Sequence, residues 1–129
     1  MAQSLESRLS RRERQIMDYL FQHGSATVAR VRLGIPDAPS YSAVRALLGI
    51  LEQKGHVRHR EDGPRYVYEP TESRENARKS ALRHMVRIFF DGSLPQAVAG
   101  LLELSDGKLS GAAADQLAVL IQKARAETR

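Results

Sequence analysis

The sequence contains no cysteine and no tryptophan, and its aromatic residues are four tyrosines and three phenylalanines. Without cysteine there are no disulfide bonds, thiolate metal ligands or thiol catalysis, and the composition is compatible with a reducing cytoplasm. No apolar run approaches the roughly 18 residues of a membrane span, and the first residues lack the apolar segment of a signal peptide. We therefore expect a soluble cytoplasmic protein without membrane insertion.

Catalytic and metal-binding patterns are also missing. No Ser-His-acid constellation, glycine-rich phosphate loop or pair of carboxylates has a spacing that indicates a reaction. The best metal-ligand candidates are the histidines at 23, 56, 59 and 84, but His56 and His59 should point to opposite faces of an extended segment. We expect no enzyme activity, no metal site and no cofactor.

The net charge of +5 is unevenly distributed along the chain. Residues 92–129 contain four basic and four acidic residues, so the whole positive excess lies in residues 1–91. This distribution favours a segment that faces a polyanion, joined to a neutral segment. A basic surface that is simply solvated is the alternative.

The segment from Ser40 to Lys54 has the pattern of a single amphipathic helix. Ser40 can cap its start, and Lys54 followed by Gly55 is typical of a helix end. One face carries the apolar residues Val44, Leu47, Leu48 and Leu51. The other face has no carboxylate before Glu52, so a polyanion can approach it closely.

A basic hairpin should follow this helix directly. Two β-prone runs, within Val57 to Glu69, flank the turn signal Asp62-Gly63. In the winged-helix arrangement, a helix enters the major groove of DNA and the following hairpin lies along the DNA backbone. The order of helix and hairpin predicts this arrangement here, with Ser40 to Lys54 as the recognition helix and the hairpin as the wing.

Two further helices should precede the recognition helix. Ser10 and Glu13 have the spacing of a capping box, and the first helix should end at His23-Gly24. A shorter helix should begin at Ser25 or Thr27. We expect buried side chains at Ile16, Leu20, Val28, Val31 and Leu33, and exposed ones at Arg30 and Arg32.

Three helices are expected after the hairpin: a long one after Thr71, a short one at Leu94 to Leu104, and a last one capped by Ser110. The predicted fold is therefore mainly α with a small β-hairpin wing. We expect a winged-helix DNA-binding domain at residues 1–70 and a helical dimerisation region at residues 71–129.

The apolar faces of the last three helices have little left to cover if the first bundle has its own core. A symmetric dimer would bury them, and its two-fold symmetry matches a DNA palindrome. The candidate dimerisation residues are Leu82, Met85, Val86, Phe89, Leu101, Leu117, Leu120 and Ile121. The alternative is that these helices fold back onto the first bundle.

The exposed face of the recognition helix supplies the candidate DNA-reading residue, Arg45, whose guanidinium could bind a guanine edge. Groups at the start of that helix could contact phosphates or bases. The candidate DNA contacts are Ser40, Tyr41, Ser42 and Arg45 on the helix, Arg58, Arg60 and Arg65 on the hairpin, and Arg11 and Arg12 on the first helix.

These segments, in particular Tyr41 to Arg45, Lys54-Gly55 and Arg65 to Tyr68, resemble the penicillinase-repressor family of bacterial transcription factors. The similarity runs from about Leu9 to the last helix. The resemblance implies a homodimeric repressor that binds an inverted-repeat operator in double-stranded DNA. Candidate targets are β-lactam-resistance or related stress genes and the repressor's own promoter.

The chain departs from that family at three points. The β-lactam-responsive members are inactivated when a membrane metalloprotease receptor triggers cleavage at an Asn-Phe bond; the equivalent bond here is Gly100-Leu101, which argues against cleavage. The copper-responsive members use a cysteine motif, which this chain lacks. Gly49 interrupts the recognition helix, and it marks a close approach to DNA or to the wing, or else neutral drift.

Two other functions remain open from the sequence. One is a small-molecule-responsive regulator with a ligand between the last helices, although those helices offer few polar groups for a pocket. The other is a winged-helix protein-interaction subunit that binds an acidic protein through its basic face.

Overall fold

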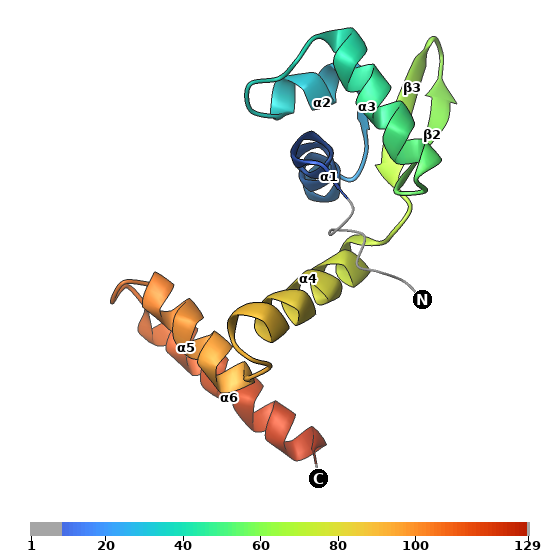
Figure 1. Cartoon of the computed structure of the whole chain (residues 1–129). Helices are drawn as coiled ribbons and strands as arrows, with labels where there is room; N and C mark the ends of the chain where they lie inside the picture. Colours follow the sequence, from blue (N-terminus) through green and yellow to red (C-terminus); the bar gives the residue numbers. More distant parts are fainter. Residues whose placement is uncertain (1–8, 129) are drawn as a thin grey trace. The chain divides into compact units, whose positions relative to one another are not determined.

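Figure 1 shows a computed structural model of the chain, and it describes residues 9–128. The structure divides into two compact units, of which the first ends at Ala81 and the second begins at Leu82. The assignment of DNA binding to residues 1–70 and of dimerisation to residues 71–129 stays a prediction. The outer ends of those two ranges, residues 1–8 and residue 129, lie outside the described residues.

The first unit combines helices with a three-stranded antiparallel sheet (Figure 1). Its elements are α1 (Arg11–His23), β1 (Ala26–Thr27), α2 (Val28–Gly34), α3 (Tyr41–Gln53), β2 (Val57–Asp62), β3 (Arg65–Pro70) and the beginning of α4 (Arg74–Phe89). The hairpin of β2 and β3 directly follows α3, so the predicted winged-helix fold is confirmed. The two-residue strand β1, which pairs with β3 through Ala26 and Thr27, was not predicted.

Side-chain caps fix where the helices begin. The backbone N–H of Ser10 donates to Glu13 Oε1 at 2.7 Å and the N–H of Glu13 donates to Ser10 Oγ at 3.2 Å, so the predicted capping box is confirmed. Thr27 caps α2 and Ser40 caps α3 through the N–H groups three residues later. The predicted helix starts are therefore correct.

The core of the first unit lies between α1, α2, α3 and the sheet. Its fully buried side chains include Ile16, Leu20, Val31, Val44, Leu48, Leu51 and Val57. The prediction of a buried Leu33 was wrong, because this side chain is 82% exposed. Leu33 lies two positions after the buried Val31 and therefore points to another side of the helix. Ile35, in extended backbone just after α2, is buried instead.

A partly buried ion pair joins α1 to the end of α3. Glu13 is only 3% exposed, and Lys54 Nζ lies 3.0 and 2.9 Å from its two carboxylate oxygens. Burial acts to raise the pKa of Glu13, but the hydrogen bonds from Ser10 and Lys54 outweigh it and hold that pKa below its ordinary value. The carboxylate thus caps α1 and holds Lys54, the residue that ends α3 as its C-cap.

The second unit contains the rest of α4, together with α5 (Leu94–Leu104) and α6 (Gly111–Glu127). Ser93 and Ser110 cap the last two helices, as predicted for Ser110. Of the described residues from Leu82 onward, only Ala97 is buried. Gly100 of α5 lies against the ring of Phe90, and a Cβ at this position would meet two ring atoms at 3.1 Å.

None of the helices described within residues 9–128 is both long and apolar enough to cross a membrane.

The Glu13–Lys54 pair yields a stability prediction. Glu13→Gln should lower the free energy of unfolding by about 1–2 kcal/mol at neutral pH, because the pair is buried on one side and half-exposed on the other. Since the folded pKa of Glu13 is lowered, its contribution is present above the unfolded pKa of about 4.3 and is lost as the pH falls through the folded pKa. The difference between wild type and variant should therefore shrink in acid.

Urea denaturation at a series of pH values measures this difference. Glu75→Gln is the matched control, because the exposed Glu75 forms only a 3.6 Å pair with Lys79 and should cost less than about 0.5 kcal/mol. Equal losses for the two variants at neutral pH would contradict the role of Glu13.

Candidate nucleic-acid interface

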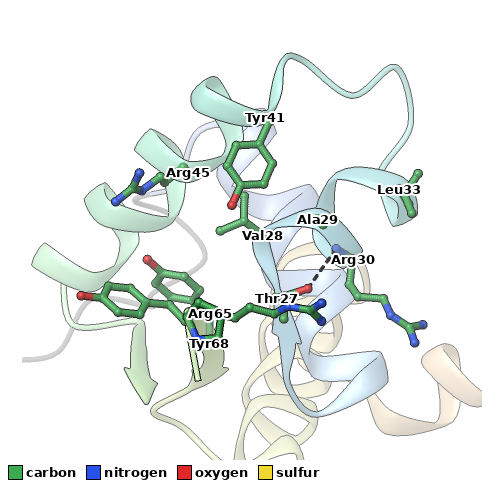
Figure 2. Close-up of a pocket in the computed structure, with 11 residues that line it drawn as sticks. Thr27, Val28, Ala29, Arg30, Leu33, Tyr41, Arg45, Arg65 and Tyr68 are labelled. Carbon is green, nitrogen blue, oxygen red and sulfur yellow. Dashed lines mark hydrogen bonds between the residues drawn. The ribbon is translucent and has the colours of Figure 1, made fainter. Parts of the chain in front are cut away.

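A groove of about 570 Å³ lies between α2, α3 and the hairpin (Figure 2). We call it the basic groove, and its lining residues are Thr27, Val28, Ala29, Arg30, Leu33, Tyr41, Arg45, Pro64, Arg65, Tyr66 and Tyr68. Three of these residues are arginines and none is acidic. The groove therefore has a positive potential suited to an anion.

The three arginines come from three different elements. Arg30 lies in the first turn of α2, Arg45 in the second turn of α3, and Arg65 at the start of β3. All three are exposed. In Figure 2, Arg30 and Arg45 lie at opposite ends of the groove, and the side chain of Arg65 extends toward Thr27. The three guanidinium groups could contact successive charges of an extended polyanion.

Tyrosine rings form part of the wall of the basic groove. Tyr41 and Tyr66 are exposed, whereas Tyr68 is buried. Burial and the nearby carboxylate of Glu52 raise the pKa of Tyr68, against an opposing effect of Arg45, so its hydroxyl stays protonated and can donate a hydrogen bond. The groove thus combines cations with aromatic surface and hydroxyl groups.

Three predicted contact residues, Tyr41, Arg45 and Arg65, are brought together in the basic groove. Ser40 and Ser42 lie beside it at the start of α3, where Ser40 Oγ accepts the N–H of Ala43 at 3.2 Å. The two hydroxyl oxygens are 3.3 Å apart. Ser40 is therefore engaged in capping, while Ser42 is exposed.

Arg12 is engaged in hydrogen bonds to the protein's own backbone. Its guanidinium donates to the carbonyl oxygens of Pro36 at 2.7 Å and Asp37 at 2.5 Å. Arg32 makes a similar bond, from Nε to the carbonyl of Pro39 at 3.1 Å. Both arginines thus hold the segment that leads into α3, whereas Arg11 is exposed on the first turn of α1.

The two other hairpin arginines share one carboxylate. Glu69 lies 2.9 Å from Arg58 and 3.6 Å from Arg60, and Arg58 is its partner in the strand register. Both guanidinium groups are more than half exposed. Glu69 offsets part of their charge, which it does not do for the arginines of the basic groove.

Arg30, Tyr66 and Tyr68 line the basic groove but were not predicted as site residues. Arg30 was expected only to be exposed. The start of α2 reaches the hairpin because β1 pairs with β3, and a two-residue strand leaves no recognisable pattern. The alternation of Tyr66 and Tyr68 along one strand face was the available signal for the tyrosines.

His59 contacts neighbouring side chains instead of another histidine. Its Nδ1 lies 2.6 Å from a carboxylate oxygen of Glu52, and its ring stacks on Tyr66. In the part of the chain that the structure describes, no three histidine, aspartate or glutamate side chains gather as a metal site would require.

Comparison with protein families finds one match of high coverage. The model of the penicillinase repressor family matches residues 9–123. No curated protein sequence matches this chain.

Three solved structures are similar to this chain at low identity. BpsR of Bordetella bronchiseptica, whose DNA binding is regulated by 6-hydroxynicotinic acid, is 16% identical over 94% of this chain and 78% of BpsR, with a TM-score of 0.49. ZitR of Lactococcus lactis, a zinc-responsive MarR family member, is 19% identical over 95% of this chain and 78% of ZitR, with a TM-score of 0.45. The archaeal chromatin protein TrmBL2 is 21% identical over 80% of this chain and 38% of TrmBL2, with a TM-score of 0.45.

Gly49 yields a prediction about the recognition helix. A Cβ at this position would meet nothing within 4 Å, so packing against the wing does not require glycine. Gly49→Ala should raise the free energy of unfolding by about 1 kcal/mol, the propensity difference between glycine and alanine inside a helix. Thermal or urea denaturation measures the change.

Gly34→Ala is the matched control, because a Cβ at Gly34 would collide with the ring of Tyr19. The same substitution should therefore destabilise the protein at position 34 and stabilise it at position 49. A loss of stability for Gly49→Ala would show that the glycine has a structural role.

Proposed function

This chain belongs to the penicillinase repressor family of DNA-binding transcriptional regulators, and we propose that it is a homodimeric repressor that binds an inverted-repeat operator in double-stranded DNA. The observation that carries the proposal is the basic groove, in which three arginines and no acid surround the space between α3 and the hairpin. It works in the cytoplasm, where its DNA partner is, and its own promoter is the first candidate target.

The recognition helix α3 enters the major groove in this proposal. Arg45 reads a guanine edge, and Ser42 and Tyr41 contact the DNA at the start of the helix. The hairpin follows the DNA backbone, and Arg65 contacts a phosphate. Arg30, at the start of α2, contacts a phosphate on the other side of the basic groove.

The remaining candidate residues have weaker or indirect roles. Arg11, Arg58 and Arg60 contact the backbone, with the hairpin pair weakened by its bonds to Glu69. Arg12 supports DNA binding through the segment before α3, because its guanidinium already binds two carbonyl oxygens there. Ser40 supports it by capping α3.

The second unit supplies the dimer interface in this proposal. Phe89 is 74% exposed in the protomer, and Leu82, Leu101, Leu120 and Ile121 are also at least half exposed. Met85, Val86 and Leu117 are half-buried. Burying such side chains is worth about 1.5–3 kcal/mol each, and a two-fold axis would place two recognition helices on the halves of a palindrome.

We do not expect release of the DNA through a membrane metalloprotease receptor. The residue pair at the position of the family's cleavage site is Gly100-Leu101, and Gly100 is constrained by the ring of Phe90.

Fluorescence anisotropy on the promoter DNA upstream of the chain's own gene tests the proposal. We expect binding about 10³-fold tighter than to scrambled DNA of the same length, at two protomers per site. Equal binding to both, with a steep salt dependence, would contradict a repressor and favour an acidic protein partner.

Two arginine variants separate reading from backbone contact in the same assay. Arg45→Ala should cost about 1–3 kcal/mol on the operator and relax the preference at one base pair. Arg65→Ala should weaken operator and scrambled DNA equally and lower the salt slope by about one. An unchanged base preference in Arg45→Ala would remove Arg45 from the reading residues.

Analytical ultracentrifugation tests the dimer. The Ile121→Glu variant should still fold as a protomer, because Ile121 is exposed. It should shift the full-length chain from dimer to monomer, because dimerisation would bury the new charge at the interface. Leu33→Glu is the matched control, because Leu33 is exposed in the first unit. A dimer in both variants would contradict the assignment of the interface to the second unit.

A further inference from the structure

One acidic side chain of the recognition helix connects it to the hairpin. Glu52, in the last turn of α3, has its carboxylate oxygens 2.9 and 2.6 Å from His59 Nδ1 in β2. Both side chains are about one-third exposed. The ring of His59 in turn stacks on Tyr66 of β3, with 4.2 Å between ring centroids and 16° between the planes.

This chain of contacts ends at the basic groove. Tyr66 lines the groove and directly follows Arg65, which lines it as well. Glu52 itself is not among the groove-lining residues. The position of a groove wall therefore depends on a bond made outside the groove.

The sheet provides little other support for this part of the hairpin. β1 pairs with β3 only at Val67 and Tyr68, and β2 is an edge strand. His59 lies opposite Tyr68, and Arg60 lies opposite Val67, the last residue of β3 on that side that also pairs with β1. The hairpin from residue 61 to residue 66 is therefore a two-stranded ribbon. An isolated two-stranded ribbon is only marginally stable in water. Its direction must be fixed by side chains that link it to α3.

We propose that Glu52 and His59 form a positioning pair that holds the hairpin at a fixed distance from α3, and so sets how Arg65 and Arg45 jointly contact DNA. The inference rests on the proposed function, and it assigns Glu52 a favourable role in binding a polyanion. Simple electrostatics gives the opposite sign, because a carboxylate next to a DNA-binding face repels phosphates.

This difference in sign makes the inference testable. Glu52→Met and Glu52→Gln both remove one negative charge, but only glutamine keeps an oxygen that can accept a hydrogen bond from His59. If Glu52 acted through its charge alone, both variants would bind DNA more tightly. Under the inference, Glu52→Met binds operator DNA roughly three- to tenfold more weakly, and Glu52→Gln recovers part of the loss.

Glu61→Gln is the matched control, because Glu61 is an exposed carboxylate of the same strand as His59. Its removal should leave affinity unchanged or raise it. The double variant of Glu52→Met and Arg65→Ala should bind more tightly than the sum of the single losses predicts, since a displaced hairpin no longer brings Arg65 to a phosphate. A general loss of fold would instead appear as a lower thermal midpoint and additive losses.

The anisotropy assay with operator and scrambled DNA separates the two levels of the proposal. If the wild-type chain prefers the operator but Glu52→Met binds equally well or more tightly, the positioning pair is overturned and the proposed function stands. If the wild type shows no preference, the proposed function fails. The pair is then still tested on scrambled DNA, because the hairpin contacts phosphates of any sequence: weaker binding of Glu52→Met supports it, and equal or tighter binding overturns it.

Discussion

The buried carboxylate of Glu13 is the contact on which the position of the end of α3 depends. It accepts the N–H of Ser10 at the start of α1 and holds Lys54 at the end of α3. Gly55 follows immediately with a φ of 86°, and the hairpin begins two residues later. The direction in which the chain leaves the recognition helix is thus fixed by a residue 41 positions earlier. A carboxylate so deeply buried is tolerated because its oxygens receive both backbone and charged donors.

The start of the recognition helix is held by a different kind of bond. Arg12 and Arg32, from α1 and α2, donate to backbone carbonyls between Pro36 and Pro39. Asp37 in this segment has a φ of 47°, a conformation that needs support from its surroundings when the residue is not glycine. The recognition helix is therefore fixed at both ends by basic side chains that face the protein. Not every arginine of a basic protein is available to its partner.

The sequence was sufficient for the parts of this structure that depend on local patterns. Helix starts at Ser10, Ser40 and Ser110 followed from capping residues, and the hairpin followed from Asp62-Gly63 between two β-prone runs. The basic face of α3 followed from the absence of acids, and Arg45 and Arg65 do line one groove. These features need only residues within a few positions of one another.

The parts that sequence reasoning missed depend on long-range pairing. Leu33 was assigned to the core from its apolar character, although a helix of seven residues has too few turns to define its buried side. The bonds from Arg12 to the carbonyl oxygens of Pro36 and Asp37 were not predicted, because these two acceptors lie 24 and 25 residues away in the sequence. Arg30 lies in the basic groove because the pairing of the short strand β1 with β3 brings the start of α2 next to the hairpin. To predict each of these features, one must know which distant segments of the chain are in contact in the folded protein.

If the exposed apolar side chains of the second unit form the proposed dimer interface, the stability of the chain also depends on its concentration. Among the residues described from Leu82 onward, only Ala97 is buried in the protomer, so association would bury most of the apolar surface of this unit. The unfolding temperature should then rise with protein concentration. In the proposed repressor, dimer assembly and operator binding both use the same protomers. If that proposal holds, dilution by cell growth would reduce operator occupancy more steeply than in direct proportion to the protein concentration.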